Sequence, residues 1–473
     1  MYQNEMIVFF FLNYYGETPV IHKKINMIGG ALLGLGSVLT IPAHAANDTI
    51  KDLIKIMHEN GQITDEQYKI LLNGAKADEE QTAAVKNDLV AEVEEKTKNL
   101  PKITTKGKLK IESQDGEWSF QPIGRVMWDA MSVDSDGSGR DEFQGTELRR
   151  ARLGFEGEIY DWGYKFEGDF ANGKTAIKDA FVSYGTKFGD NKFKVKLGQS
   201  QIAFGFNTAA SSKYMTFMDR PWFADSALSP ARESGIAAKL SGHSWSLASS
   251  ITIGEFESGI TEDDIDGTTY ALRGTFLPFQ QDKMHLIQIG AGYRRVTSNK
   301  NGFSYSQHLV AHKDHNKIKL GNSIAAADFD GIDNYEVDAV GIYGPFHALA
   351  EYNKFSADSS LANNDVDIDS YAIEAGYFLT GESMKLKHGF WDGITPKSQL
   401  GAWQVAARYE SMNIDDSVAG DDKASKWTIG LNYYPTKNTR LMLNYDNVID
   451  WDQNGLDQNA EPSAIKFRAQ AKW

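Results

Sequence analysis

Short runs that alternate strictly between apolar and polar residues recur from Trp118 to the end of the chain. The last ten residues read AIKFRAQAKW, with an apolar side chain at every second position and three cations between them. Because successive side chains of a strand point to opposite faces, this segment predicts a strand with one apolar and one positive face. An edge strand of a soluble sandwich and a strand of a membrane barrel both fit this single segment.

The number of such runs favours the barrel. We count sixteen, near residues 118–132, 146–158, 162–171, 177–187, 192–200, 235–241, 244–254, 268–277, 284–298, 336–344, 346–357, 368–379, 401–412, 424–434, 438–448 and 464–473. Short connections such as YDWG, GDN and YGP alternate with long ones such as DSDGSGRDEF. This alternation is typical of bacterial outer-membrane barrels. The pattern predicts an all-β fold, a 16-stranded antiparallel transmembrane β-barrel with an aqueous lumen.

The front of the chain follows other patterns. Two lysines, an apolar run and the triplet AHA predict a secretory signal over residues 1–45, of which residues 1–22 are an extra upstream extension. Residues 46–100 place apolar residues at helical spacing, and Thr64 with Gln67 forms a helix-start signal. They predict a helical or coiled-coil segment in the periplasm; a flexible tether is the alternative. The barrel would then span residues 101–473.

Composition narrows the function classes. The chain has no cysteine, which excludes disulfides, thiolate metal sites and cysteine nucleophiles. It is rich in aromatic residues and glycine, yet its mean hydropathy of -0.43 is too polar for a helical membrane bundle. The formal net charge of -15 argues against nucleic acid as a partner.

The barrel region resembles the phosphate-selective porins of the porin O and porin P type. The resemblance covers residues 104–473 and rests on KGKLKIESQDGEWSFQPIGRVMWD, ELRRARLGFEGEIYDWGYKFEGDFA, IKDAFVSYG, KVKLGQ, FGFNTAASSKYMTFMDR, YFLTGE and GAWQVAARY, in the family's order. It implies a homotrimer in the outer membrane of a Gram-negative bacterium that lets small anions such as phosphate or polyphosphate diffuse passively. It also implies that the long, aromatic-rich connection 201–234 folds inward and narrows the pore.

The resemblance also implies which residues bind anions. Motif by motif, these are Arg125, Arg149, Arg150, Lys213, Arg220, Lys106 and Lys196. Arg125 matches an arginine of the constriction, and Lys213 and Arg220 match cations of the binding zone. Arg149 and Arg150 match a pair on the entry path, although strict alternation places only Arg150 clearly in the lumen. Lys106 and Lys196 match lysines on the periplasmic side.

Other residues are assigned by alternation or by their position. The lumen-wall candidates are Arg152, Lys466, Arg468 and Lys472, and the terminal aromatic Trp473 corresponds to the usual assembly signal of such porins. An outer-membrane barrel is expected to contact lipid, lipopolysaccharide and the barrel assembly machinery. Acids at 358, 365, 367 and 369 stand where phosphate-binding members carry several bases. They favour an alternative, a less selective porin for another small solute. In this alternative the helical segment of the porin acts as a cell-wall tether.

An outer-membrane enzyme is a further alternative of a different class. The sequence contains no G-x-S-x-G elbow, no H-E-x-x-H helix and no phosphate-cradling Gly-Lys loop. The stretch DSDGSGRDEFQG resembles a calcium loop but lacks the glutamate at its twelfth position. His308, His312 and His315 have the spacing of a helical metal site but lie in a predicted loop or strand region. We therefore expect no catalysis, no cofactor and no metal.

Overall fold

The computed structural model describes residues 43–473 apart from 106, 137, 226–227, 229–231, 255–266, 298–301, 322, 362–363, 417, 419 and 454–455. The chain divides into two units, the first ending at Asn99 and the second spanning Leu100–Trp473. The prediction of a signal falls almost entirely outside the described residues and stays a prediction.

The first unit contains two helices, α2 (Ala43–Glu59) and α3 (Asp65–Thr97). They pack through the buried side chains of Ile54 and Ala75. Helix α3 begins with the predicted signal: the backbone N–H of Gln67 donates to Oγ1 of Thr64 (3.3 Å), and the backbone N–H of Thr64 donates to Oε1 of Gln67 (2.9 Å). The helical prediction for residues 46–100 is thus confirmed. Within the described ranges, no helix combines the length and the apolar character that a membrane crossing requires.

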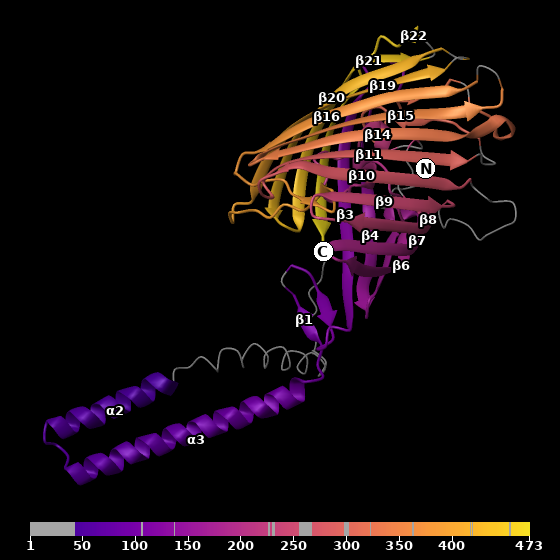
Figure 1. Cartoon of the computed structure of the whole chain (residues 1–473). Coiled ribbons are helices and arrows are strands. Elements are labelled where there is room, and N and C mark those ends of the chain that lie inside the picture. The colour runs from indigo at the N-terminus through magenta and orange to yellow at the C-terminus, as the bar shows by residue number, and fades with distance from the viewer. Residues whose placement is uncertain are drawn as a thin grey trace, which may run out of the picture. The chain divides into compact units, whose positions relative to one another are not determined.

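The second unit is a closed barrel (Figure 1). Within the described residues its wall consists of sixteen strands: β3 (Trp118–Asp134), β4 (Phe143–Ile159), β5 (Trp162–Asp169), β6 (Ala176–Phe188), β7 (Asn191–Gln201), β8 (Arg232–Ser241), β9 (Trp245–Thr252), β10 (Thr269–Gln280), β11 (His285–Thr297), β14 (Phe329–Tyr343), β15 (Phe346–Ser359), β16 (Val366–Phe378), β19 (Ala402–Asp416), β20 (Asp422–Thr436), β21 (Thr439–Gln453) and β23 (Ser463–Lys472). Each pairs antiparallel with the next, and β23 pairs with β3, so that Phe467 lies opposite Ala130. The predicted fold is confirmed.

The remaining elements are short. They are β1 (Lys102–Thr104), β2 (Lys110–Glu112), β12 (Ser306–His308), β13 (Lys317–Lys319), β17 (Leu386–Lys387), β18 (Phe390–Trp391), β22 (Leu456–Asp457), the helix α4 (Phe206–Ala209) and the 3-10 turns η1 (Ala171–Gly173), η2 (Trp222–Ala224) and η3 (Ala326–Asp328). Strands β1 and β2 pair with each other, and β2 continues the pairing onto β3.

Connections of two lengths alternate around the barrel. We call the end that holds the short connections and the C-terminus the turn end, and the opposite end the loop end. One connection departs from the predicted alternation: residues 379–401 join β16 to β19 at the turn end and include the β17–β18 hairpin. We call residues 385–392 the turn-end hairpin.

The two faces of the wall differ in polarity. Apolar side chains such as Ile465, Val337 and Ile373 are exposed on the outside, whereas Lys466 and Arg468 of β23 are buried inside. At the seam, Trp473 and Gly124 exchange backbone hydrogen bonds of 3.1 and 3.2 Å. The outward apolar face is the one that a lipid bilayer would cover.

Two loop-end connections fold into the barrel. The first, which we call L3, comprises residues 202–231, and the second, the cap loop, comprises residues 302–321. They are fastened together and to the wall, because Nε1 of Trp222 in L3 and Nζ of Lys426 in β20 both donate to the carbonyl oxygen of Leu309 (3.1 and 2.6 Å). Trp222 and Leu309 lie in a large apolar cluster inside the barrel. The inward fold predicted for L3 is confirmed, while that of the cap loop was not foreseen.

Candidate functional site

L3 divides the interior of the barrel. Its backbone is hydrogen-bonded to one side of the barrel wall through three arginines. The donors Arg408, Arg440 and Arg468 reach the carbonyl oxygens of Asp219, Met215 and Met218 at 2.9, 2.6 and 2.6 Å, respectively. Between L3 and the opposite wall lies a cavity of about 2230 Å³, lined by strands β3 to β11, L3, the cap loop, the turn-end hairpin and Lys426 of β20. This cavity is the candidate site.

The charge of the cavity is opposite to that of the chain. Nineteen cations line it: Arg125, Arg149, Arg150, Arg152, Lys165, Lys178, Lys187, Lys192, Lys194, Lys196, Lys213, Arg220, Arg232, Lys239, Arg273, Lys283, Lys385, Lys387 and Lys426. Six acids accompany them: Glu156, Asp179, Asp190, Asp219, Asp225 and Asp392. The chain as a whole has a net charge of -15. Positive charge is therefore concentrated in this cavity, where low-dielectric walls strengthen its field.

More than half of these cations form no ion pair with any carboxylate of the described residues. Within the described part of the chain, eight of the nineteen form ion pairs. The eleven that form none there are Arg150, Lys178, Lys187, Lys192, Lys194, Lys196, Lys213, Lys239, Lys283, Lys385 and Lys387. An unpaired cation in a hollow is available to a mobile anion, because its charge is not neutralised by the protein.

Arg125 of β3 links the wall to L3. Its guanidinium donates to Oγ of Ser212 in L3 at 3.1 Å and to the carboxylate of Glu167 at 3.1 and 3.3 Å. Glu167 also accepts from Arg152 at 3.0 Å, so two guanidiniums share one carboxylate. Arg152 also donates to Asp169 at 2.8 Å, so the two arginines are balanced by two carboxylates. The network fixes Arg125 beside the segment that carries Lys213.

A β-bulge turns both entry arginines inward. Along β3 and β4, Met127 pairs with Arg150 and the next residue, Trp128, pairs with Leu148, so Arg149 is an extra residue in the ladder. A bulge re-aims side chains locally. Both Arg149 and Arg150 line the cavity, and Arg149 pairs with Asp225 of L3 at 3.3 Å. The alternation rule, which placed only Arg150 in the lumen, was therefore wrong for Arg149.

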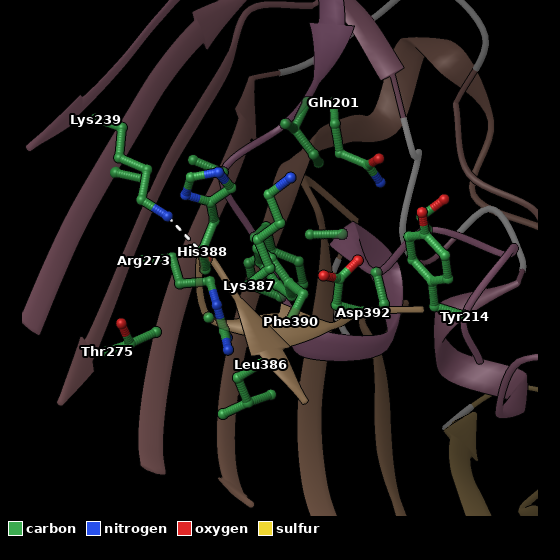
Figure 2. Close-up of a pocket in the computed structure, with 18 of the residues that line it drawn as sticks. Gln201, Tyr214, Lys239, Arg273, Thr275, Leu386, Lys387, His388, Phe390 and Asp392 are labelled. Atoms are coloured by element: carbon green, nitrogen blue, oxygen red, sulfur yellow. Dashed lines mark hydrogen bonds between the residues drawn. The ribbon is translucent and has the colours of Figure 1, made fainter. Parts of the chain in front are cut away.

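Lys213 and Tyr214 of L3 face the turn-end hairpin. Nζ of Lys472 lies 4.0 Å from the centre of the Tyr214 ring and Nζ of Lys213 lies 5.6 Å from it, as in cation–π contacts. Asp392 extends toward Tyr214 from the hairpin (Figure 2). Among the described residues, no donor hydrogen-bonds to the Asp392 carboxylate. This part of the cavity thus combines two lysines, a phenol and one carboxylate.

Arg220 holds the shape of L3. Its Nε and one terminal nitrogen each donate at 2.7 Å, to the carbonyl oxygens of Asn207 and Ala210. The far side of the same segment is held by Glu351 of β15, which accepts from the backbone N–H groups of Phe206 and Asn207 at 2.8 and 3.0 Å. Arg220 lines the cavity as expected, but most of its donors are occupied by the backbone of L3 itself.

The turn-end hairpin enters the barrel between L3 and the wall (Figure 2). Phe390 contacts the ring of Phe206 at 5.6 Å between centroids, and Lys239 of β8 donates to the carbonyl oxygen of His388 at 2.9 Å. Gln288 of β11 donates to the carbonyl oxygen of Gly389 at 3.0 Å. The hairpin is thereby held on two sides, and it adds Lys385 and Lys387 to the cavity.

The remaining predicted residues occupy different surroundings. Lys196 lines the cavity, with Nζ 4.8 Å from the centre of the Phe181 ring. Lys466 and Arg468 face inward as alternation predicts, but L3 and the cap loop cover them: Lys466 pairs with Asp219 at 2.8 Å and Arg468 with Asp129 at 2.6 Å. They fasten the loops and do not line the cavity. Lys106 lies outside the described residues.

The acids at positions 358–369 do not enter the cavity. Asp358 pairs with Arg295 at 3.1 Å, Asp369 accepts from the hydroxyl of Tyr352, and Asp365 accepts from the backbone N–H of Ser359 at 2.7 Å. These contacts lie on the outward face of the barrel or in the exposed β15–β16 connection. These acids therefore do not reduce the positive charge of the lining.

Comparison with known proteins now decides the family. The family model of the phosphate-selective porins O and P matches residues 120–473. The chain belongs to this porin family. It is an outer-membrane protein and is 27% identical over 385 residues to Porin O of Pseudomonas aeruginosa, covering 72% of this chain and 86% of the relative.

Two further proteins are similar to this porin. An uncharacterised protein of Caulobacter vibrioides is 26% identical over 373 residues, with 72% of this chain and 71% of that protein covered. The solved structure of OprB from Pseudomonas putida superimposes with a TM-score of 0.51 at 8% identity, covering 75% of this chain and 94% of that chain. This structural likeness concerns the fold of the porin alone.

Sequence reasoning missed most of the turn-end cations of the porin. Lys187, Lys192 and Lys194 line the cavity beside Lys196 on the β6–β7 hairpin. Their signal was present, because Lys192, Lys194 and Lys196 alternate with Phe193, Val195 and Leu197. Lys385 and Lys387 gave no such signal, since they lie in a connection that was expected to be a plain turn.

Proposed function

We propose that the chain is a passive channel for small anions, with phosphate or polyphosphate as solutes, and that it catalyses no reaction. The single observation that carries the proposal is the excess of nineteen cations over six acids along the cavity of an acidic chain. An anion that enters a narrow pore loses water, and fixed guanidinium and ammonium donors replace that water. Rings of such cations select anions in pores.

The order of the cations suggests a path. An anion would enter at the loop end past Arg149 and Arg150, pass Arg125 and Lys213 at the constriction beside L3, and leave past the lysines of the turn end. Several moderate sites suit conduction better than one tight site, because the ion must also leave. The carboxylate of Asp392 next to Lys213 would weaken binding at the narrowest part and favour release.

Orientation and assembly belong to the same proposal. The loop end would face the outside of the cell and the turn end the periplasm, which also places the helical unit there. Family membership supports a homotrimer. The exposed apolar belt supports contact with outer-membrane lipid and lipopolysaccharide, and Trp473 at the seam supports a role as the signal read by the barrel assembly machinery.

Planar-bilayer recordings of the purified full chain test the proposal. We expect a discrete conductance, a reversal potential in a KCl gradient that corresponds to anions over cations, and a chloride current that falls when phosphate is added. Cation selectivity would refute the anion channel and leave the barrel intact. An anion-selective current that phosphate does not reduce would favour the less selective porin for another solute.

A further inference from the structure

Two histidines of the cap loop face the loop-end part of the cavity. His308 ends β12 and His312 lies in the bend before β13, and both line the cavity. Their ring centres are 6.2 Å apart. The spacing of the histidines in the sequence is that of a helix, but the β12–β13 hairpin is the element that brings the two rings together. The third histidine of the segment, His315, stacks instead on Phe143 at 5.6 Å and does not line the cavity.

Hydrogen bonds fix the tautomer of both rings. Nδ1 of His308 lies 2.5 Å from the carbonyl oxygen of Asp314, and Nδ1 of His312 lies 3.0 and 3.1 Å from the carboxylate oxygens of Glu147. A carbonyl and an ionised carboxylate only accept, so each Nδ1 carries the proton and donates it. A ring that carries its proton on Nδ1 and is not further protonated presents the lone pair of Nε2. Among the described residues, neither Nε2 atom has a hydrogen-bond partner.

This arrangement is the one that metal-binding histidines use. A histidine that ligates a metal through one nitrogen usually donates its other N–H to a carboxylate or a carbonyl, which orients the ring. With metal–nitrogen distances of about 2.0–2.1 Å, two rings on one tetrahedral ion have centres roughly 5 Å apart. The centres of His308 and His312 lie 6.2 Å apart, so binding one ion would draw the rings together by about 1 Å. We propose that His308 and His312 form an entrance site for one first-row transition-metal ion such as Zn²⁺, bound through the two Nε2 atoms.

The surroundings determine which ions fit. In the described chain, no cluster of three or more His, Asp or Glu residues suited to a metal occurs, so solvent or a passing anion would complete the coordination. Lys313 and Arg149 lie near Glu147, and Lys317 lies near His308, which makes the entrance positive. This positive charge opposes every cation, so the donor set decides which ion binds. Two imidazoles suit Zn²⁺, Cu²⁺ and Ni²⁺, whereas hard cations need several carboxylates.

The two rings lie on the path proposed for the anions, because both line the cavity. A metal ion held there would stand in the entrance and change the passage of anions, an effect that goes beyond the proposed anion diffusion.

The test uses the purified full chain and Zn²⁺ itself. Isothermal titration calorimetry should show saturable binding of one Zn²⁺ per chain, which EDTA reverses. His308→Gln and His312→Gln should each abolish it, while His315→Gln should bind as the wild type does. Glu147→Gln should weaken binding about tenfold, as loss of an orienting carboxylate does. Circular dichroism would verify that each variant keeps its strand content.

Two results would overturn the proposal: no saturable Zn²⁺ binding by the wild type, or unchanged binding by a folded His308→Gln/His312→Gln variant. Calorimetry does not depend on ion selectivity, so its outcome is separate from that of the channel proposal. In bilayers, Zn²⁺ added on the loop-end side should lower the wild-type current and leave the current of His312→Gln unchanged.

Discussion

Arg149 and Arg150 are consecutive residues of one strand, yet both line the same cavity. The bulge opposite Met127 and Trp128 makes this possible, since it inserts one residue into β4 and re-aims its neighbour. The two guanidiniums differ in their partners: Arg149 pairs with Asp225, whereas Arg150 forms no ion pair within the described residues. Arg150 is thus the entry cation most available to a passing anion.

Replacing Arg150 with glutamine should lower the preference for anions. A unit charge at 4 Å in water contributes ~1 kcal/mol, which corresponds to about fivefold in local anion concentration. We expect the anion-to-cation permeability ratio, measured from reversal potentials, to fall by about this factor. Lys354→Gln removes the same charge from the outward face of β15 and serves as the control. Equal effects of the two variants would show that Arg150 acts only through the net charge of the chain.

Titration of Lys213 should make the anion selectivity of the channel depend on pH. Burial, followed by the repulsion of Arg125 and Lys165, lowers the pKa of Lys213 to about 8. The ammonium is therefore charged at pH 7 and becomes neutral as the pH rises through 8. We expect anion selectivity to fall between pH 7 and pH 9 in the wild type, measured by reversal potential. Lys213→Arg stays charged and should lose less selectivity than the wild type over this range; an equal decline in this variant would contradict the assignment.

Asp392 opposes the cations around it. Its carboxylate lies in the part of the cavity lined by Lys213, Tyr214 and Lys472, and Asp392→Asn removes this negative charge. We expect stronger block of the chloride current by phosphate, by about fivefold in the half-blocking concentration if the charges are ~4 Å apart in water. Asp282→Asn in the exposed β10–β11 turn should leave the block unchanged. Weaker block in Asp392→Asn would mean that the carboxylate assists anion binding.

Glu351 should control the position of L3. It accepts hydrogen bonds from the backbone N–H and from the side chain of Asn207 at 3.0 and 2.7 Å, and Glu351→Ala leaves these buried donors unpaired at a cost of about 1–3 kcal/mol each. We expect a larger single-channel conductance and weaker anion selectivity, because L3 is released from its wall. Glu158→Ala removes an exposed carboxylate from β4 and is the control. Unchanged conductance in Glu351→Ala would show that the arginine contacts suffice.

The C-terminal seam requires a glycine. A Cβ atom at Gly124 would lie 2.2 Å from the Trp473 ring, so Gly124→Ala must displace the ring from β3. We expect a lower yield of folded barrel, measured as the fraction that migrates as a compact band on unheated SDS gels. Gly274→Ala in β10, where a Cβ meets no atom within 4 Å, is the matched control. A normal yield for Gly124→Ala would show that Trp473 can relax without loss of closure.

The repeated strands of the barrel could be predicted from the sequence, whereas the local features of single strands and connections could not. The sixteen strands follow from period-two alternation, whereas the inward fold of L3 was implied by the family resemblance. The bulge at Arg149 could not be predicted, since one inserted residue leaves the apolar pattern of β4 nearly intact. The inward course of the turn-end hairpin and the cap loop depends on contacts such as Gln288 with Gly389, between residues far apart in the chain.

The hydrogen bonds that hold L3 to the barrel wall affect which residues of L3 can differ between such channels. Arg408, Arg440 and Arg468 donate to carbonyl oxygens of its backbone, and Asn432 donates to the carbonyl oxygen of Thr216 at 2.9 Å. Every residue type supplies a carbonyl, so these hydrogen bonds do not themselves depend on the side chains at the positions they hold. The barrel wall therefore holds L3 through its backbone. The residues of L3 that line the cavity, and with them the ion selectivity, can change while the wall stays the same.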